Sequence, residues 1–271
     1  MKISNYCDDV VDVYAQYRQP IGVNMILDKI RSNFPTLQNK DIHILDCGGC
    51  CGNYSKILYK HGFKITLVDQ NESMLEKLRK ENLKGLNIVS ANITEPLPFE
   101  NNTFDVIIIN QVIHHFGDND KEFYHHTNLF NECSRILKYD GLFSINTCNH
   151  DNYQYGYWWS ELVMDNIEPY YSRYCPEEKL LKLLQKSGFK STKKICTEPF
   201  IGKTYFTKEF IFNPDVRKTD TVWKYISDET YRMMLDHYKK MSYQDFTQLF
   251  EDRLQLMNKY GQSIFVFSTK K

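Results

Sequence analysis

ILDCGGCCGN, residues 44–53, is the stretch that decides the fold. An apolar run ends at the acidic residue Asp46 and leads into a loop of small residues that contains Gly48, Gly49 and Gly52. Small residues let a backbone approach a ligand closely, and the free N–H groups at the start of a helix attract polar or anionic groups. The order of strand, glycine-rich loop and helix predicts a ligand-binding loop at the end of a strand.

Apolar runs and helical patterns alternate after this loop. The sequence predicts strands at 41–46, 64–69, 87–91, 104–110 and 142–146, with helices at 53–60, 72–82 and 123–137. Strands that alternate with helices indicate a parallel sheet covered by helices on both faces. The continuous run VIIIN at 106–110 suits a strand that is buried on both faces. The expected fold class is α/β, with a doubly wound sheet.

The two flanks of this segment follow a different pattern. Apolar residues at helical spacing predict a helix over 21–31, and further elements are predicted at 176–188 (helix), 189–196 (strand), 228–240 and 242–258 (helices) and 263–268 (strand). We therefore expect four parts: an N-terminal helical segment at 1–39, a cofactor-binding core at 40–149, cap insertions at 150–175 and 200–258, and the last core elements at 176–199 and 259–271.

Charge and hydropathy exclude some classes of partner. The 271 residues carry 34 Lys+Arg and 34 Asp+Glu, and this zero net charge argues against nucleic acids and anionic membranes as partners. The sequence has no uninterrupted apolar run of about 18 residues, so we expect no membrane-spanning helix. MKISNYCDDV at the start has no apolar signal region, which favours a cytoplasmic location.

Three of the eight cysteines, Cys47, Cys50 and Cys51, are clustered in the loop. Their spacing invites a metal interpretation, but a zinc site normally needs a second ligand pair farther along, and none is suitably spaced. We expect reduced thiols and no metal.

Asp69 is the second chemical signal. It follows Gly52 by 17 residues and ends the next predicted strand. A carboxylate at that strand tip can accept hydrogen bonds from ribose hydroxyls, in the crevice where ligands of such sheets bind. Together, the loop and Asp69 predict a cofactor that contains a nucleoside.

On these residues the sequence resembles the class I S-adenosylmethionine-dependent methyltransferases, and within them the methyltransferase type 11 group that includes ubiquinone/menaquinone biosynthesis enzymes. Residues 45–52, LDCGGCCG, correspond to the family's L-D-x-G-x-G-x-G, with Cys50 in place of the middle glycine. Cysteine disfavours a positive φ, so we expect the backbone to adjust at Cys50. Further similar segments are 67–75, 90–93, 97–105 and 110–116.

The resemblance implies a Rossmann-like sheet and a site for S-adenosylmethionine, with S-adenosylhomocysteine as product. It implies that the loop cradles the cofactor, that Asp69 holds the ribose, and that Asn92 contacts the adenine where the family commonly has Asp. The implied cofactor-binding residues are Arg18, Asp46, Gly48, Cys50, Gly52, Asp69, Gln70, Met74, Asn92, Ile93 and Asn110.

The sequence is less informative about the residues that bind the methyl acceptor than about those that bind the cofactor. His114 or His115 can serve as a general base near the methyl acceptor, or the pair can simply fill a loop by hydrogen bonding. The aromatic residues Tyr153, Trp158 and Tyr205 can line an acceptor pocket, or they can pack the cap onto the sheet.

The expected activity is methyl transfer from S-adenosylmethionine to a small-molecule acceptor, in line and with water excluded. The sequence leaves the acceptor, the methylated atom and the oligomeric state open. One alternative is a methyltransferase-like binding or scaffold protein without catalysis, because Cys50 and Asn92 depart from the family pattern. Another is a NAD-dependent oxidoreductase, whose G-x-G-x-x-G fingerprint the loop does not match.

Overall fold

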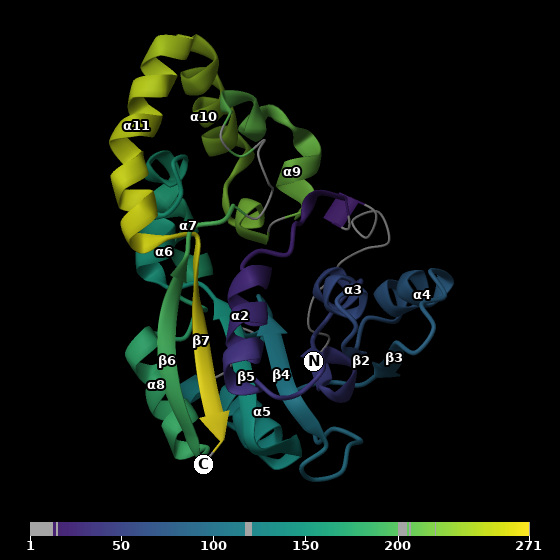
Figure 1. The fold of residues 1–271 in the computed structure, drawn as a ribbon. Coiled ribbons are helices and arrows are strands. Elements are labelled where there is room, and N and C mark those ends of the chain that lie inside the picture. The colour runs from purple at the N-terminus through teal and green to yellow at the C-terminus, as the bar shows by residue number, and fades with distance from the viewer. Residues whose placement is uncertain are drawn as a thin grey trace.

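A computed structural model describes residues 13, 14, 16–116, 121–199, 205, 207–219 and 221–270. One seven-stranded sheet with the order β3-β2-β1-β4-β5-β7-β6 forms its centre (Figure 1). The strands are β1 His43–Cys47, β2 Lys64–Asp69, β3 Asn87–Ser90, β4 Phe104–Asn110, β5 Leu137–Thr147, β6 Phe189–Cys196 and β7 Ser263–Lys270.

Strand direction divides the sheet into two parts. β1 to β5 run parallel to one another, whereas β7 is antiparallel to both β5 and β6. The predicted doubly wound fold is confirmed, and an antiparallel hairpin at one side makes the sheet mixed. The strand order reverses between β1 and β4, and ligands of such sheets bind outside the carboxyl ends of the strands at that reversal.

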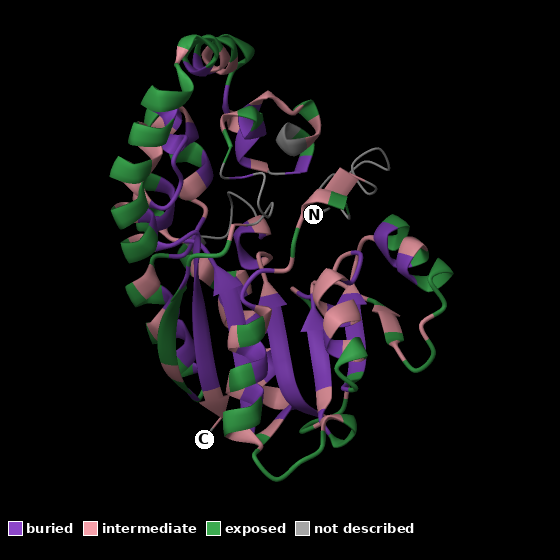
Figure 2. Ribbon diagram, turned by 45° about the horizontal axis from the view of Figure 1, so that its top comes forward, coloured by how far each residue is buried: buried purple, intermediate pink, exposed green. Residues whose placement is uncertain are grey.

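Helices cover both faces of the sheet. α2 (Val23–Asn33) and α3 (Asn53–Lys60) pack on one face, and α5 (Tyr124–Ile136) and α8 (Glu177–Lys186) pack on the other. The VIII run of β4 serves both faces, since Val106 and Ile108 belong to the first core and Ile107 and Ile109 to the second. Figure 2 shows the central strands as almost entirely buried. α4 (Glu72–Lys80) packs beside β3.

The segments around residues 150–175 and 205–260 form a helical cap beyond the carboxyl ends of the strands (Figure 1). Its helices are α6 His150–Tyr155, α7 Met164–Tyr171, α9 Pro214–Thr219, α10 Asp228–Lys240 and α11 Tyr243–Tyr260. Trp158 lies at the centre of this cap, with its ring 5.2 Å from that of Tyr238 and 5.1 Å from that of Phe246. None of the described helices has the length and apolar character needed to cross a membrane.

One predicted boundary is wrong. The sequence predicts a turn at Asp140–Gly141 and a strand from 142, but β5 already begins at Leu137. Asp140 takes a φ of 59°, and the register with β4 shifts between Phe104 and Val106. The turn residues therefore form an irregularity within a longer strand.

Candidate functional site

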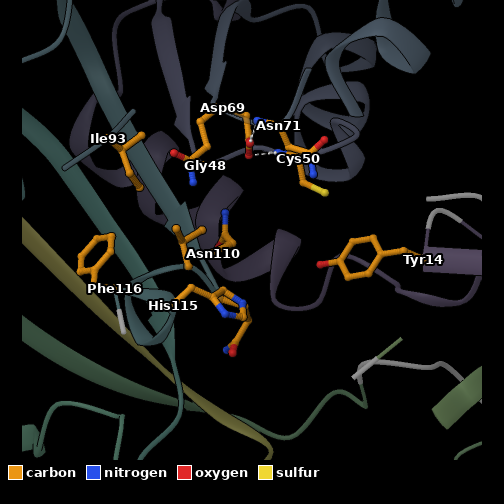
Figure 3. A pocket seen from close by; sticks show the side chains of 12 residues that line it. Tyr14, Gly48, Cys50, Asp69, Asn71, Ile93, Asn110, His115 and Phe116 are labelled. Atoms are coloured by element: carbon orange, nitrogen blue, oxygen red, sulfur yellow. Dashed lines mark hydrogen bonds between the residues drawn. The ribbon is translucent and has the colours of Figure 1, made fainter. Parts of the chain in front are cut away.

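A two-lobed cleft lies over the carboxyl ends of β1, β2 and β4. The first lobe, whose lining residues Figure 3 shows, has about 630 Å³ of space including open solvent, and its walls include Asp69, Ile93 and Phe116. The second lobe has about 490 Å³ of space including open solvent, and its walls include Arg18 and Asp46. Both lobes are lined by Tyr14, Gly48, Cys50, Asn110 and Gln111, so they form one continuous cleft.

The glycines of the loop are required by close contacts. A Cβ on Gly48, whose φ is 76°, would lie 2.7 Å from Cγ2 of Val112. A Cβ on Gly49 would lie 2.5 Å from Cδ1 of Leu67. Gly52, with a φ of 77°, precedes the first residue of α3. The loop therefore lies tight against Val112 and Leu67, and Gly48 and Gly49 also border the cleft.

Cys50 corrects one expectation. We expected the backbone to adjust so that a non-glycine residue would avoid a positive φ, but Cys50 itself adopts a φ of 54°. Its backbone N–H donates a hydrogen bond to Oδ2 of Asp69, at 2.8 Å. This bond contributes to holding the residue in the left-handed conformation that glycine would adopt more easily.

Asp69 joins the loop to the end of β2. Besides the bond from Cys50, its Oδ1 accepts a hydrogen bond from the N–H of Asn71 at 2.8 Å. Burial raises the pKa of Asp69, and the hydrogen bonds from backbone N–H groups oppose that shift. Each carboxylate oxygen keeps further acceptor capacity, and the side chain lies on the wall of the first lobe.

Asp46 lies at the base of the second lobe, with only 2% of its surface exposed. Ser55 Oγ on α3 donates a hydrogen bond to its Oδ2, at 2.7 Å. Desolvation raises the pKa of Asp46 from 3.8 to about 6. The sequence identified Asp46 as part of the loop, and the structure adds that it ties β1 to α3.

The N-terminal segment closes the cleft from the opposite side. Arg18 lines the second lobe, and its carbonyl oxygen accepts a hydrogen bond from Nδ2 of Asn53 at 3.0 Å. Tyr14 faces the loop across the cleft (Figure 3) and lines both lobes. The Arg18 guanidinium lies 5.9 Å from the centre of the Tyr14 ring. Tyr14 is not among the site residues predicted from the sequence.

Asn110 is the unusual polar residue of the cleft. It ends β4 and lines both lobes, and neither Oδ1 nor Nδ2 of its buried amide has a hydrogen-bond partner among the described residues. The next residue behaves differently, because Gln111 Nε2 donates to Oδ1 of Asn146 at 2.7 Å. A buried amide without partners costs about 1–3 kcal/mol per group, which a bound ligand can recover.

The other predicted cofactor residues divide into two groups. Gln70 and Ile93 line the first lobe. Met74 is fully buried and lines neither lobe, but it packs against Cys51, which borders the second lobe. Asn92 is not among the lining residues either, and its Oδ1 accepts hydrogen bonds from N and Oγ1 of Thr94 at 3.1 and 3.0 Å. The oxygen expected to contact adenine is therefore used within the chain.

The two histidines lie between the cleft and the cap. His115 lines the first lobe, whereas His114 is buried and stacks on Tyr174 of the cap, with ring centres 4.4 Å apart. Desolvation and the nearby Arg173 lower the pKa of His115 to about 3, and desolvation and His115 lower the pKa of His114 well below its usual value. Both imidazoles are therefore neutral and weakly basic near pH 7.

Tyr153, Trp158 and Tyr205 are core residues of the cap, which is the second of the two roles that the sequence left open. All three are at most 2% exposed, and none lines either lobe. Trp158 Nε1 donates to the carbonyl oxygen of Tyr205 at 2.8 Å, and the hydroxyls of Tyr153 and Tyr174 are 3.0 Å apart. Their rings fill the cap because indole and phenol groups bury large apolar areas when their polar atoms find partners.

Metal-binding chemistry is not evident in the part of the chain that the structure describes. It contains no group of three or more His, Cys, Asp or Glu side chains that could hold a metal ion. The seven cysteines described are all free thiols, and Cys7 lies outside the described residues.

The fold resembles that of solved methyltransferases. Among solved structures, a protein of Anabaena variabilis ATCC 29413, assigned to an antibiotic biosynthesis pathway as a methyltransferase, aligns with a TM-score of 0.70 at 16% identity, over 94% of this chain and 99% of that one. A Haemonchus contortus phosphoethanolamine N-methyltransferase 2, solved with phosphomonomethylethanolamine and S-adenosylhomocysteine, aligns with a TM-score of 0.57 at 20% identity, over 98% of this chain and 58% of that one.

Sequence comparison finds a family that matches part of the chain. Residues 45–145 match the family model described as a methyltransferase domain. A curated relative from Oryza sativa subsp. japonica, 2-methyl-6-phytyl-1,4-hydroquinone methyltransferase 1, is 28% identical over 160 residues, which is 58% of this chain and 44% of the relative. The chain spans less than half the length of this relative.

Proposed function

We propose that the protein is an S-adenosylmethionine-dependent methyltransferase that acts on a small molecule. The observation that carries the proposal is the continuous two-lobed cleft over the glycine-rich loop, with Asp69 on one wall and Arg18 on the other. The cofactor is a nucleoside joined to an amino acid, and the two lobes offer matching chemistry for these two halves. The methyltransferase domain match over residues 45–145 supports the same assignment.

The nucleoside half is assigned to the first lobe. Asp69 would accept hydrogen bonds from the ribose hydroxyls, while Gln70 and Ile93 would lie beside the adenine. Because Oδ1 of Asn92 is bonded to Thr94, Ile93 is the stronger candidate for adenine contact in this segment. Met74 would act behind the loop, by supporting its shape.

The amino-acid half is assigned to the second lobe. Arg18 would attract its carboxylate, and Asp46 would favour its ammonium group. Asn110, at the junction of the lobes, would give its unpartnered amide to the amino-acid part. The sulfonium would then lie near Asn110, with the bound cofactor supplying an activated methyl group.

The acceptor is assigned to the side of the cleft where His115 lies. A neutral, weakly basic His115 can orient an acceptor by hydrogen bonding, and methyl transfer needs a base only when the acceptor must lose a proton. We expect His115→Gln to change the KM for the acceptor more than kcat, and the wild-type rate to show no inflection near pH 6.5. An inflection there that disappears in His115→Gln would restore the general-base role.

The test of the cofactor assignment is calorimetric titration with S-adenosylmethionine and S-adenosylhomocysteine, with NADH as control. Binding of the first two without NADH is the expected result, and binding of NADH alone would establish the oxidoreductase alternative. An acceptor screen would begin with hydroquinones and phosphorylated ethanolamines, the compounds named for the relatives. Cofactor binding without turnover on any acceptor would favour the scaffold alternative.

The location expected from the sequence, the cytoplasm, is part of this proposal. Cell fractionation with an antibody against the chain would test it, and recovery in a membrane or organelle fraction would contradict it.

A further inference from the structure

Two adjacent thiols, those of Cys50 and Cys51, lie at the turn between β1 and α3. Cys50 lines both lobes of the cleft, and Figure 3 shows its sulfur on the cleft side of the loop. Cys51 is almost fully buried, packs against Met74 and borders only the second lobe. One thiol of the pair is therefore open to small molecules that enter the cleft, and the other is held beside it.

The surroundings favour a thiolate at Cys51. Interaction with the neighbouring Cys50 thiol and the positive charges of Lys56 and Lys77 lower the pKa of Cys51, against the opposing effect of its burial. The pKa of Cys50 is raised well above its usual value, by the interaction with Cys51 and by burial. Cys51 also precedes the N-terminus of α3, where the helix dipole favours negative charge, and its thiol donates a hydrogen bond to Oδ1 of Asn53 at 3.5 Å. Ionisation of the pair therefore leaves a thiolate at Cys51 and a thiol at Cys50.

A disulfide between these two residues would change the loop. Consecutive Cα atoms are about 3.8 Å apart across a trans peptide, while disulfides usually join Cα atoms about 4.4–6.8 Å apart. The loop would have to distort to close the bond. The hydrogen bond from Cys50 N–H to Asp69 and the left-handed φ of Cys50 are features that such a distortion would disturb. A strained disulfide is also readily reduced, so the change would be reversible.

We propose that Cys50 and Cys51 form an oxidation site, at which hydrogen peroxide joins the two thiols in a disulfide and so removes the affinity of the cleft for its cofactor. This inference rests on the function proposed above. A thiolate of the pair attacks one peroxide oxygen, the O–O bond breaks, and a sulfenic acid and hydroxide form. The hydroxide takes the proton of the second thiol and becomes water. The thiolate produced in this way displaces hydroxide from the sulfenic sulfur, and this hydroxide takes a proton from solvent to become the second water. Two thiols and one peroxide thus give one disulfide and two waters.

The test compares the binding of S-adenosylhomocysteine by the full chain before and after treatment with hydrogen peroxide. We expect peroxide to weaken binding about tenfold or more, dithiothreitol to restore it, and bound S-adenosylhomocysteine to slow the oxidation. Peptide mapping by mass spectrometry should find a disulfide between Cys50 and Cys51. Oxidation of other residues alone, or unchanged affinity once this disulfide has formed, would overturn the proposal.

Two variants and a second thiol pair sharpen the test. Cys51→Ala and Cys50→Gly each lack one thiol of the pair. The affinity of each variant for S-adenosylhomocysteine is compared before and after peroxide treatment, so a substitution that changes the affinity of the untreated protein does not affect the comparison. Both should lose the reversible response. Cys47 and Cys133 form another hydrogen-bonded pair, but both are fully buried, so Cys133→Ala should respond to peroxide as the wild type does.

The outcomes separate this inference from the proposed function. If the reduced protein does not bind S-adenosylhomocysteine, the cofactor assignment fails and the switch fails with it. If the reduced protein binds and the oxidised protein binds equally well, only the switch fails.

Discussion

Asp69 has two tasks at the scale of single residues. It accepts one backbone hydrogen bond on each carboxylate oxygen, from Cys50 and from Asn71, and it also faces the first lobe. Shaping of the loop and the proposed contact with the ribose therefore depend on the same side chain. Asp46 is similar in the second lobe, because it holds Ser55 while lying at the base of the cleft.

Replacement of Asp69 separates these two tasks. Asp69→Ala should weaken cofactor binding by about 1–3 kcal/mol, because charge-assisted hydrogen bonds to the ribose and the support of Cys50 are lost together. Asp69→Asn keeps one acceptor oxygen for the loop and removes the charge, so it should lose less cofactor-binding free energy than Asp69→Ala. Calorimetry with S-adenosylhomocysteine measures both, and unchanged affinity in Asp69→Ala would contradict the ribose assignment.

Replacement of Asp46 tests a pH dependence. The folded-state pKa of Asp46 is about 6, above its usual 3.8, so the folded state binds more protons between pH 4 and 6 and stability falls as pH rises through that window. Asp46→Asn removes this loss. Relative to the wild type, the variant should gain up to about 3 kcal/mol in free energy of unfolding between pH 4 and pH 7.

Urea denaturation at the two pH values provides the measurement, and a variant whose relative stability is the same at both would show that Asp46 ionises normally. Binding should move in the opposite direction, because the ammonium group of the cofactor loses a carboxylate at the base of the second lobe. Higher stability with weaker binding would identify Asp46 as a residue retained for the ligand.

At the scale of elements, the cap joins the sheet through a close crossing. Gly156 follows α6 and Gly261 follows α11, and a Cβ on Gly156 would lie 1.8 Å from the carbonyl oxygen of Gly261. Asn152 on α6 reinforces the crossing by donating from Nδ2 to the carbonyl oxygen of Tyr260 at 2.8 Å. Two backbones approach here with no space for a side chain.

Gly156→Ala should therefore separate these elements and cost roughly 3 kcal/mol of unfolding free energy, because backbone atoms cannot move aside cheaply. Gly85→Ala is the matched control. Gly85 has a φ of 88°, but a Cβ added there would meet no described atom within 4 Å, so only backbone strain of roughly 1 kcal/mol is expected. If urea denaturation showed the same loss of unfolding free energy for both variants, the close approach of Gly156 to Gly261 would be shown to tolerate a methyl group.

At the scale of the whole molecule, the cap and one face of the sheet share a hydrophobic core. Trp158 and Trp223 of the cap belong to the same cluster of buried side chains as Ile44 of β1 and Val106 of β4. All three tryptophans of the chain, Trp158, Trp159 and Trp223, lie in the cap. Intrinsic fluorescence therefore reports on the cap, while far-UV circular dichroism reports on all helices and strands.

We expect the two signals to give the same midpoint in urea, because a shared core makes the cap and the sheet unfold together. An earlier fluorescence transition would show instead that the cap opens by itself. Trp223→Phe, which keeps an aromatic ring at that position, controls for the contribution of this single fluorophore.

Much of this architecture could be predicted from the sequence. The VIIIN run and the alternation of strands and helices predicted the doubly wound sheet, because local hydrophobic periodicity depends directly on element type. The glycine loop and Asp69 lie together as predicted, since the carboxyl ends of parallel strands meet at one edge.

Features that depend on packing between distant segments were not predictable. Nothing in the spacing of Tyr153, Trp158 and Tyr205 distinguishes a packed core from a pocket wall, because aromatic residues serve both roles. Tyr14 faces the loop only because the N-terminal segment folds back over it. The positive φ of Cys50 is supported by a hydrogen bond from its N–H to Asp69, which lies 19 residues farther along the chain.

The hairpin at the side of the sheet has an evolutionary consequence. β6 ends and β7 begins at positions that pair with each other, Cys196 with Ser263, so the segment between them leaves and re-enters the sheet at one point. The N–H of Gln262 also bonds to the carbonyl oxygen of Cys196 at 2.8 Å. During evolution the segment between β6 and β7 can lengthen, shorten or be replaced while the strands below the cleft stay the same. New ligand specificities can therefore arise on an unchanged sheet.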